Sequence, residues 1–150
     1  MAKLAFASFL LWAITVAAAA FFYINGVTRT GLDGRREVIL SESERQAVQA
    51  DMRKLLQTVA DITAALARPD APAVARLAGA VGMQAAALES PALLAKLPID
   101  FKTAGMNMHA SFDQLSAAAK GGSSQARLTT MLSEQLQACA ACHEVYRLAR

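Results

Sequence analysis

The feature that most limits what this chain can fold into is an uncharged, apolar stretch near its N-terminus, from Leu4 to Ile24. At about 1.5 Å per residue, a helix of this length spans the roughly 30 Å hydrocarbon core of a membrane. The stretch is also longer than the apolar runs of ordinary buried helices. We therefore expect residues 1–24 to be a transmembrane anchor or a signal peptide.

The residues on either side of the stretch bear on this choice. Lys3 precedes it and Ala17–Ala20 offers cleavage positions, as in a signal peptide. The apolar run continues past these alanines, however, and cleavage there would leave an exposed hydrophobic tail, so we favour an anchor. Both interpretations export the rest of the chain. The positive-inside rule points the other way, because one lysine precedes the stretch and three arginines follow it: Arg29, Arg35 and Arg36.

The rest of the chain divides into a linker and a domain. Residues 25–40 contain three glycines, which disfavour a helix, and we expect a linker in which Glu37–Leu40 lies on the domain as an extended arm. Residues 41–150 contain eleven Lys and Arg residues and ten Asp and Glu residues. This near balance excludes the basic surface that nucleic-acid binding needs, so no nucleic acid is expected as a partner.

Hydrophobic periodicity predicts four helices after residue 40. Ser41 and Glu44 form a capping box at the start of the first. Its apolar residues recur every three or four positions, at Val48, Met52, Leu55, Val59, Ile62 and Leu66. The other helices are expected at about 70–88, 99–120 and from 124 to the chain end. Short connections make neighbours antiparallel, so we expect an all-α, up-down-up-down four-helix bundle preceded by an N-terminal transmembrane helix or signal segment.

The last predicted helix contains Cys139-Ala140-Ala141-Cys142-His143, the C-x-x-C-H sequence that attaches haem c. On a helix, residues three apart share a face, so both thiols can bond to the two vinyl groups on one edge of a porphyrin. His143 is then free to bind the iron. Two alternatives fit less well: a thioredoxin-like C-x-x-C normally follows a strand, and a structural zinc site needs four ligands, whereas only His109 remains as a further histidine.

The ending C-A-A-C-H-E-V-Y-R, together with Arg45-Gln46 near the start of the first domain helix, resembles the cytochrome c′ family. The resemblance covers about residues 41 to 150, and only the C-terminal motif is specific. It implies an export segment, a four-helix bundle and one covalently bound haem c with its iron. It also implies that Arg147 lies beside the proximal imidazole, and it suggests a homodimer.

The family divides by the group on the far side of the iron, and Met52 is our candidate for that position. Met52 lies about eleven residues into the first domain helix, and His143 lies seven residues before the end of the last, so antiparallel packing brings them near one another. Two other possibilities stay open. Met52 can simply fill the core, and counting four residues from Arg45 leads to Gln49. We expect three aromatic residues, Phe101, Phe112 and Tyr146, to pack on the haem or in the core.

These expectations define a function. They describe a monohaem cytochrome on the periplasmic side of the bacterial inner membrane, anchored by Leu4–Ile24, with His143 and Met52 as the ligands of a low-spin iron. It would pass single electrons to or from membrane or periplasmic redox proteins, and no enzyme site is expected. Three alternatives remain: a five-coordinate protein that binds nitric oxide or carbon monoxide, a haem-bearing subunit of a larger membrane complex, and a soluble periplasmic protein after cleavage.

Overall fold

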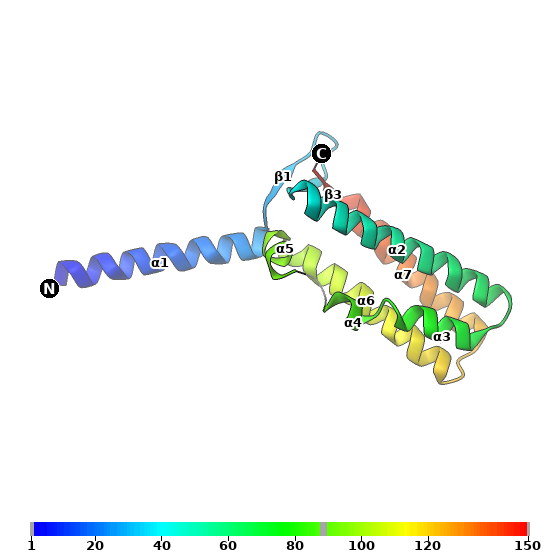
Figure 1. The fold of residues 1–150 in the computed structure, drawn as a ribbon. Coiled ribbons are helices and arrows are strands. Elements are labelled where there is room, and N and C mark those ends of the chain that lie inside the picture. The colour runs from blue at the N-terminus through cyan, green and yellow to red at the C-terminus, as the bar shows by residue number, and fades with distance from the viewer. Residues whose placement is uncertain (1, 88–89, 150) are drawn as a thin grey trace.

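The computed structural model describes residues 2–87 and 90–149 and is mostly helical, with one small sheet (Figure 1). The outermost residues of the predicted segments 1–24 and 41–150, and the end of the predicted helix 70–88, lie outside the described residues. One helix, α1 (Ala2–Asn25), projects by itself from a domain built from all the other elements.

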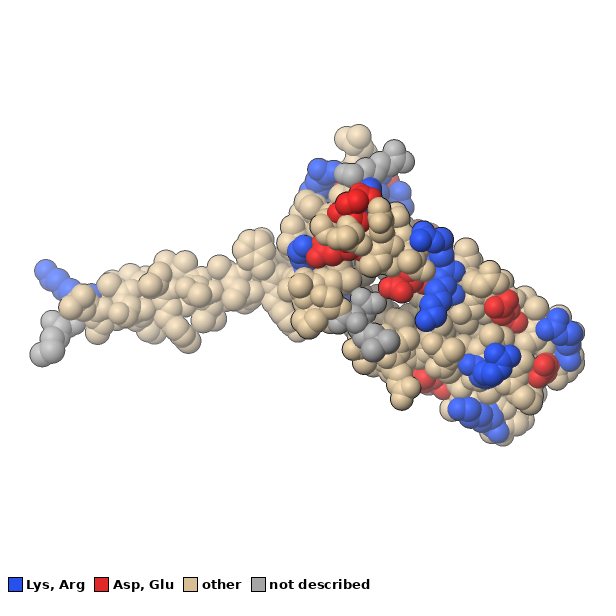
Figure 2. Space-filling view, in the orientation of Figure 1, with Lys and Arg blue, Asp and Glu red and all other residues tan. Residues whose placement is uncertain are grey.

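Helix α1 matches the predicted apolar segment. The most apolar 18-residue window within Lys3–Asn25 has a mean hydropathy of 2.2, and none of its residues is buried. Figure 2 shows charged groups at the free end of α1 and on the domain, with none along the middle of the helix. Length and composition therefore suit α1 to cross a membrane, as an anchor or as a signal sequence.

The expected extended arm belongs to a three-stranded sheet. Strand β2 (Arg36–Val38) pairs antiparallel with β1 (Thr28–Thr30) and parallel with β3 (Tyr146–Leu148). The expectation that the last helix continues to the chain end is wrong, because α7 (Gln125–Val145) gives way to β3. The reason is that β2 offers a free edge: the strand bonds of β3, and one from the Ala149 amide to the Val38 carbonyl at 2.9 Å, replace helical hydrogen bonds.

The domain contains five further helices: α2 (Glu42–Ala67), α3 (Ala71–Gly79), α4 (Met83–Ala86), α5 (Pro91–Lys96) and α6 (Ile99–Lys120). The capping box predicted at Ser41 and Glu44 is confirmed at the start of α2. Helices α2, α3, α6 and α7 pack around a common core, whereas the short α4 and α5 connect α3 to α6.

The prediction of one continuous helix over 70–88 is wrong, because α3 ends at Gly79 and α4 begins at Met83. At the interruption, Gly82 and Met83 contact Asp113 of α6. A methyl group on Gly82 would overlap the Asp113 carboxylate, which accepts a hydrogen bond from the Met83 amide at 2.9 Å. Glycine allows this approach, and Asp113 provides the helix-start bond that a side chain at Gly82 would otherwise supply.

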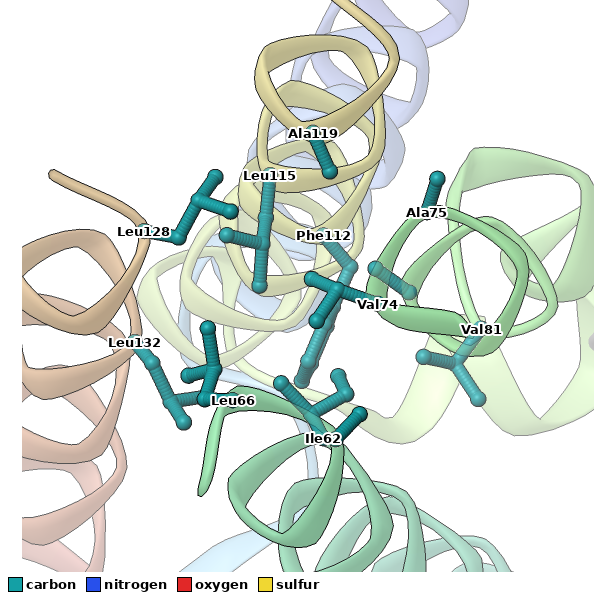
Figure 3. Close-up of a cluster of buried hydrophobic side chains, with 12 residues drawn as sticks. Ile62, Leu66, Val74, Ala75, Val81, Phe112, Leu115, Ala119, Leu128 and Leu132 are labelled. Carbon is teal, nitrogen blue, oxygen red and sulfur yellow. The ribbon is translucent and has the colours of Figure 1, made fainter. Parts of the chain in front are cut away.

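The core is divided into two clusters of buried side chains. Figure 3 shows the first, which joins α2, α3, α6 and α7. It contains Ile62, Ala65, Leu66, Val74, Ala75, Ala78, Val81, Phe112, Leu115, Ala119, Leu128 and Leu132. The second, beside the sheet, contains Val38, Val48, Leu93 and Leu97. The helices α2, α6 and α7 continue between the two clusters, and this interval holds the site described next.

Candidate haem-binding site

A cleft of about 660 Å³ lies between the two core clusters, with walls from α2, α6 and α7. Leu55, Met108 and Met131 line it and pack against the first cluster, whereas Phe101 and Tyr146 line it and pack against the second. Most of this lining is apolar, and the volume is within the roughly 300–1,000 Å³ typical of ligand and cofactor pockets. The core thus has a gap large enough for a flat apolar group.

The C-x-x-C-H residues lie on the last turns of α7, and Cys139, Cys142 and His143 all line the cleft. Helical geometry puts the two thiols on one face, as the sequence analysis assumed. Burial raises the pKa of both thiols above the ordinary value. The Cys139 sulfur also lies 4.0 Å from the sulfur of Met108 on α6. Because the thiolate is the reactive form, this burial disfavours rapid thiol–disulfide exchange at the two cysteines.

Met52 lines the same cleft from α2. It was expected on the buried stripe of this helix, yet its side chain is 40% exposed, whereas Val48 and Ile62 on that stripe are 8% and 0% exposed. The difference arises because Val48 and Ile62 each pack into one of the two core clusters, and Met52 lies between them. Met52 is therefore not a core-filling residue, and it shares the cleft with His143.

Two of the three aromatic residues expected at a haem lie in the cleft. Phe101 and Tyr146 meet edge to face, with ring centroids 5.3 Å apart and planes at 83°. Phe112 is instead part of the first core cluster, where it is 1% exposed. Its position on α6 turns it toward α2 and α3, so the ordinary-core alternative describes it.

Arg147 does not lie on a helical continuation one turn past His143, as the resemblance implied. Because α7 ends at Val145, Arg147 is in β3. Its guanidinium forms ion pairs with Glu37 and Asp33 of the segment that follows α1, which raise its pKa above the ordinary value. It therefore stabilises the sheet.

Two further cleft residues were not predicted as site residues. Gln135 is 5% exposed, and its amide nitrogen donates to the Ser111 carbonyl at 2.8 Å. Its Oε1 has no hydrogen-bond partner among the described residues. The signal in the sequence is a glutamine on the otherwise apolar face of α7. The other residue is His109, half-buried, whose Nδ1 donates to the Val81 carbonyl at 2.7 Å.

The residues present fit a haem. Open space lies beside Gly105 in the cleft, both thiols and an imidazole face it, and aromatic rings border it. In the described part of the chain, no group of three or more His, Cys, Asp or Glu side chains is arranged to hold a metal ion directly. A haem needs only one or two protein ligands, because the porphyrin supplies the other four nitrogens.

No protein-family model, curated protein or solved structure matches this chain. Function is therefore inferred from the motif and the cleft alone.

Proposed function

We propose that this protein is a membrane-anchored monohaem c-type cytochrome that transfers single electrons. Its helical domain would be a four-helix bundle of the cytochrome c′ kind, exposed on the periplasmic side of the inner membrane. One observation carries the proposal: the only two cysteines of the chain and the histidine after them open into an apolar cleft of cofactor size.

Each part of the cleft has a role in this proposal. Cys139 and Cys142 hold the haem through thioether bonds, and the His143 imidazole binds the iron. Phe101 and Tyr146 cover the ring and exclude water from that side. The haem, when bound, supplies a one-electron couple, and burial in an apolar cleft with sulfur ligation raises its reduction potential. The redox partners would be membrane or periplasmic proteins.

Met52 would be the second protein ligand of the iron, and ligation by both His143 and Met52 would make the iron low-spin. The support is its position on the α2 wall of the cleft that His143 also lines, together with its incomplete burial. His109 is the competing donor in the cleft. Its Nδ1 is held by the Val81 carbonyl, so the lone pair of a neutral imidazole is at Nε2, a pattern common for histidines that bind metals.

The experiment is expression in a host able to mature c-type cytochromes. We expect the purified chain to keep one haem after unfolding and acidified-solvent extraction, measured by mass spectrometry and by the pyridine haemochrome spectrum. C139A should leave a single thioether bond and the double variant C139A/C142A should leave none. A wild-type chain that loses its colour on extraction, or never gains any, would refute the proposal. M83A, outside the cleft, is the control and should keep its haem.

A further inference from the structure

The apolar helix α1 is fixed to the domain without a free linker. The Gly26 amide donates to the Phe22 carbonyl at 2.8 Å and so closes α1. The next residue, Val27, donates to the Lys96 carbonyl of α5 at 2.7 Å, and its own carbonyl accepts from Ile39. The chain thus passes directly from α1 into contacts with the domain, so the depth of α1 in a membrane also sets the position of the domain.

The contact between α1 and α6 has the chemistry of a membrane interface. Lys102 lies over the Tyr23 ring, 4.2 Å from its centroid, and donates to the Tyr23 carbonyl at 3.2 Å. Tyrosine side chains are enriched where the apolar core of a membrane meets its headgroups. The Lys102 amine, which contacts the Tyr23 ring, would therefore lie at the depth of the headgroups, where phosphates are the available anions.

A second basic feature lies just beyond the last residue of α1. A pocket of about 610 Å³ is lined by Asn25, by the β1–β2 hairpin and by the end of α7. Three arginines line it: Arg29, Arg35 and Arg36. They are the residues that run against the positive-inside rule, and the electron-transfer proposal gives them no role.

The three arginines differ in whether a carboxylate already pairs with them. Arg29 is ion-paired with Glu37, and Arg35 is paired with Asp33 and also donates to the His143 carbonyl at 3.2 Å. Arg36 lies over the Tyr146 ring, 5.8 Å from its centroid, and makes no ion pair within residues 2–87 and 90–149.

The charges near this pocket leave a positive excess. Four arginines (Arg29, Arg35, Arg36 and Arg147) face three carboxylates (Asp33, Glu37 and Glu144), which leaves one positive charge. At the end of α7, the His143 carbonyl, which would repel an anion, accepts a hydrogen bond from Arg35.

We propose that this end of the domain binds the headgroups of anionic phospholipids, with Arg36 and Lys102 as the principal phosphate contacts. Figure 1 places the junction of α1 at the same end of the domain as the sheet and the end of α7. Binding of lipid there holds the C-x-x-C-H turn against the membrane surface. The lipid site itself is independent of haem, whereas its consequence for electron transfer rests on the proposed function.

The test uses the full-length chain in a C139S/C142S background, so that its outcome does not depend on haem. Nanodiscs of phosphatidylcholine receive increasing fractions of phosphatidylglycerol, and the amide NMR shifts of Thr28 and Thr30 are followed. We expect saturating shifts. R36Q should raise the midpoint about fivefold, which corresponds to the contribution of one arginine at a membrane surface. R76Q is the matched control, an exposed arginine of α3 at the other end of the domain, and should leave the midpoint unchanged.

Three results would overturn the proposal. In the first, the amide shifts do not saturate as the phosphatidylglycerol fraction rises. In the second, R36Q and R76Q change the midpoint equally. Either result would indicate general charge attraction. Inorganic phosphate added to pure phosphatidylcholine discs can also produce the same shifts at the same midpoint, which would indicate a site for a free anion. The fold of each variant is checked by the rest of its amide spectrum.

Discussion

Under the proposed function, Met52 and His109 are the two residues that would decide which iron chemistry the cleft supports. Both line it, one from α2 and the other from α6, and both offer an atom that binds haem iron. A sulfur ligand favours electron transfer at a raised potential, a second imidazole lowers the potential, and an open position favours binding of small gases.

Replacement of Met52 distinguishes these cases. We expect the oxidised wild-type protein to be low-spin and to show the weak far-red band of sulfur bound to iron. M52A should become high-spin and bind carbon monoxide readily, because alanine has no atom that can bind the iron. H109A should leave both spectra unchanged. If M52A stays low-spin and H109A does not, His109 is the ligand.

The Glu44 carboxylate gives the domain a measurable pH dependence. Lys96 hydrogen-bonds both of its oxygens at 2.7 Å, and Ser41 adds bonds from its amide and hydroxyl, so the pKa of Glu44 falls from 4.5 to about 2. A depressed carboxyl pKa stabilises the fold above about pH 4.5 and loses that contribution as the pH falls toward 2.

Removal of the lysine tests this pair. We expect K96M to raise the pKa of Glu44 toward its ordinary value, because the largest cause of the shift is lost, and to shrink the acid-dependent part of the stability. A carboxyl-selective NMR titration of Glu44 measures the change. K120M, at the far end of α6, should leave that titration as it is in the wild type. An unchanged Glu44 curve in K96M would show that Ser41 alone lowers the pKa.

At the scale of single residues, the sequence predicted a large part of the candidate site. Spacing and residue type identified Cys139, Cys142, His143 and Met52, and the cleft brings them together. The expectation for Arg147 assumed that the last helix continues beyond Val145. The chain forms strand β3 there instead, so Arg147 is not on a helix. Gln135 was not predicted as a site residue. Hydrophobic periodicity shows that a polar residue lies on an apolar face, but it does not show which residues surround it.

At the scale of elements, regular segments with strong local signals were predictable and their interruptions were not. The capping box and apolar stripe set α2, whereas the end of α3 depends on the contact of Gly82 with α6. Likewise, β3 exists because it finds the edge of β2, and strand pairing between distant segments leaves little trace in either segment.

Gly26, where α1 meets the domain, gives a prediction at this scale. Its φ of +62° is left-handed, and an added methyl group would overlap the backbone of Lys96 and Pro98. We expect G26A to destabilise the domain by about 1–3 kcal/mol, measured by denaturant unfolding in detergent. G34A is the matched control, since Gly34 has a φ of +82° with nothing within 4 Å of an added methyl group. G34A therefore measures the cost of backbone strain alone. If G26A and G34A lost the same free energy of unfolding, the close contact of Gly26 with the end of α5 would contribute nothing to stability.

At the scale of the whole molecule, the attachment of α1 would fix which end of the domain faces a membrane that α1 crosses. The C139S/C142S chain can carry one fluorescent label at T30C in β1 or at K120C at the opposite end of α6. In vesicles with a headgroup-linked quencher, we expect strong quenching of the T30C label and weak quenching of the K120C label. Equal quenching at the two positions would show that the domain moves freely on α1. Recovery of the chain in the soluble periplasm without detergent would show that α1 is cleaved.

The parallel pairing of β2 with β3 has a consequence for the order of synthesis. Glu37 and Arg147, which form an ion pair across these strands, are 110 residues apart. Because β2 leaves the ribosome long before β3, the sheet stays incomplete until all the domain helices between these two strands have been made. Completion of the sheet is therefore a late step in folding, and it depends on contacts between residues that are far apart in the sequence.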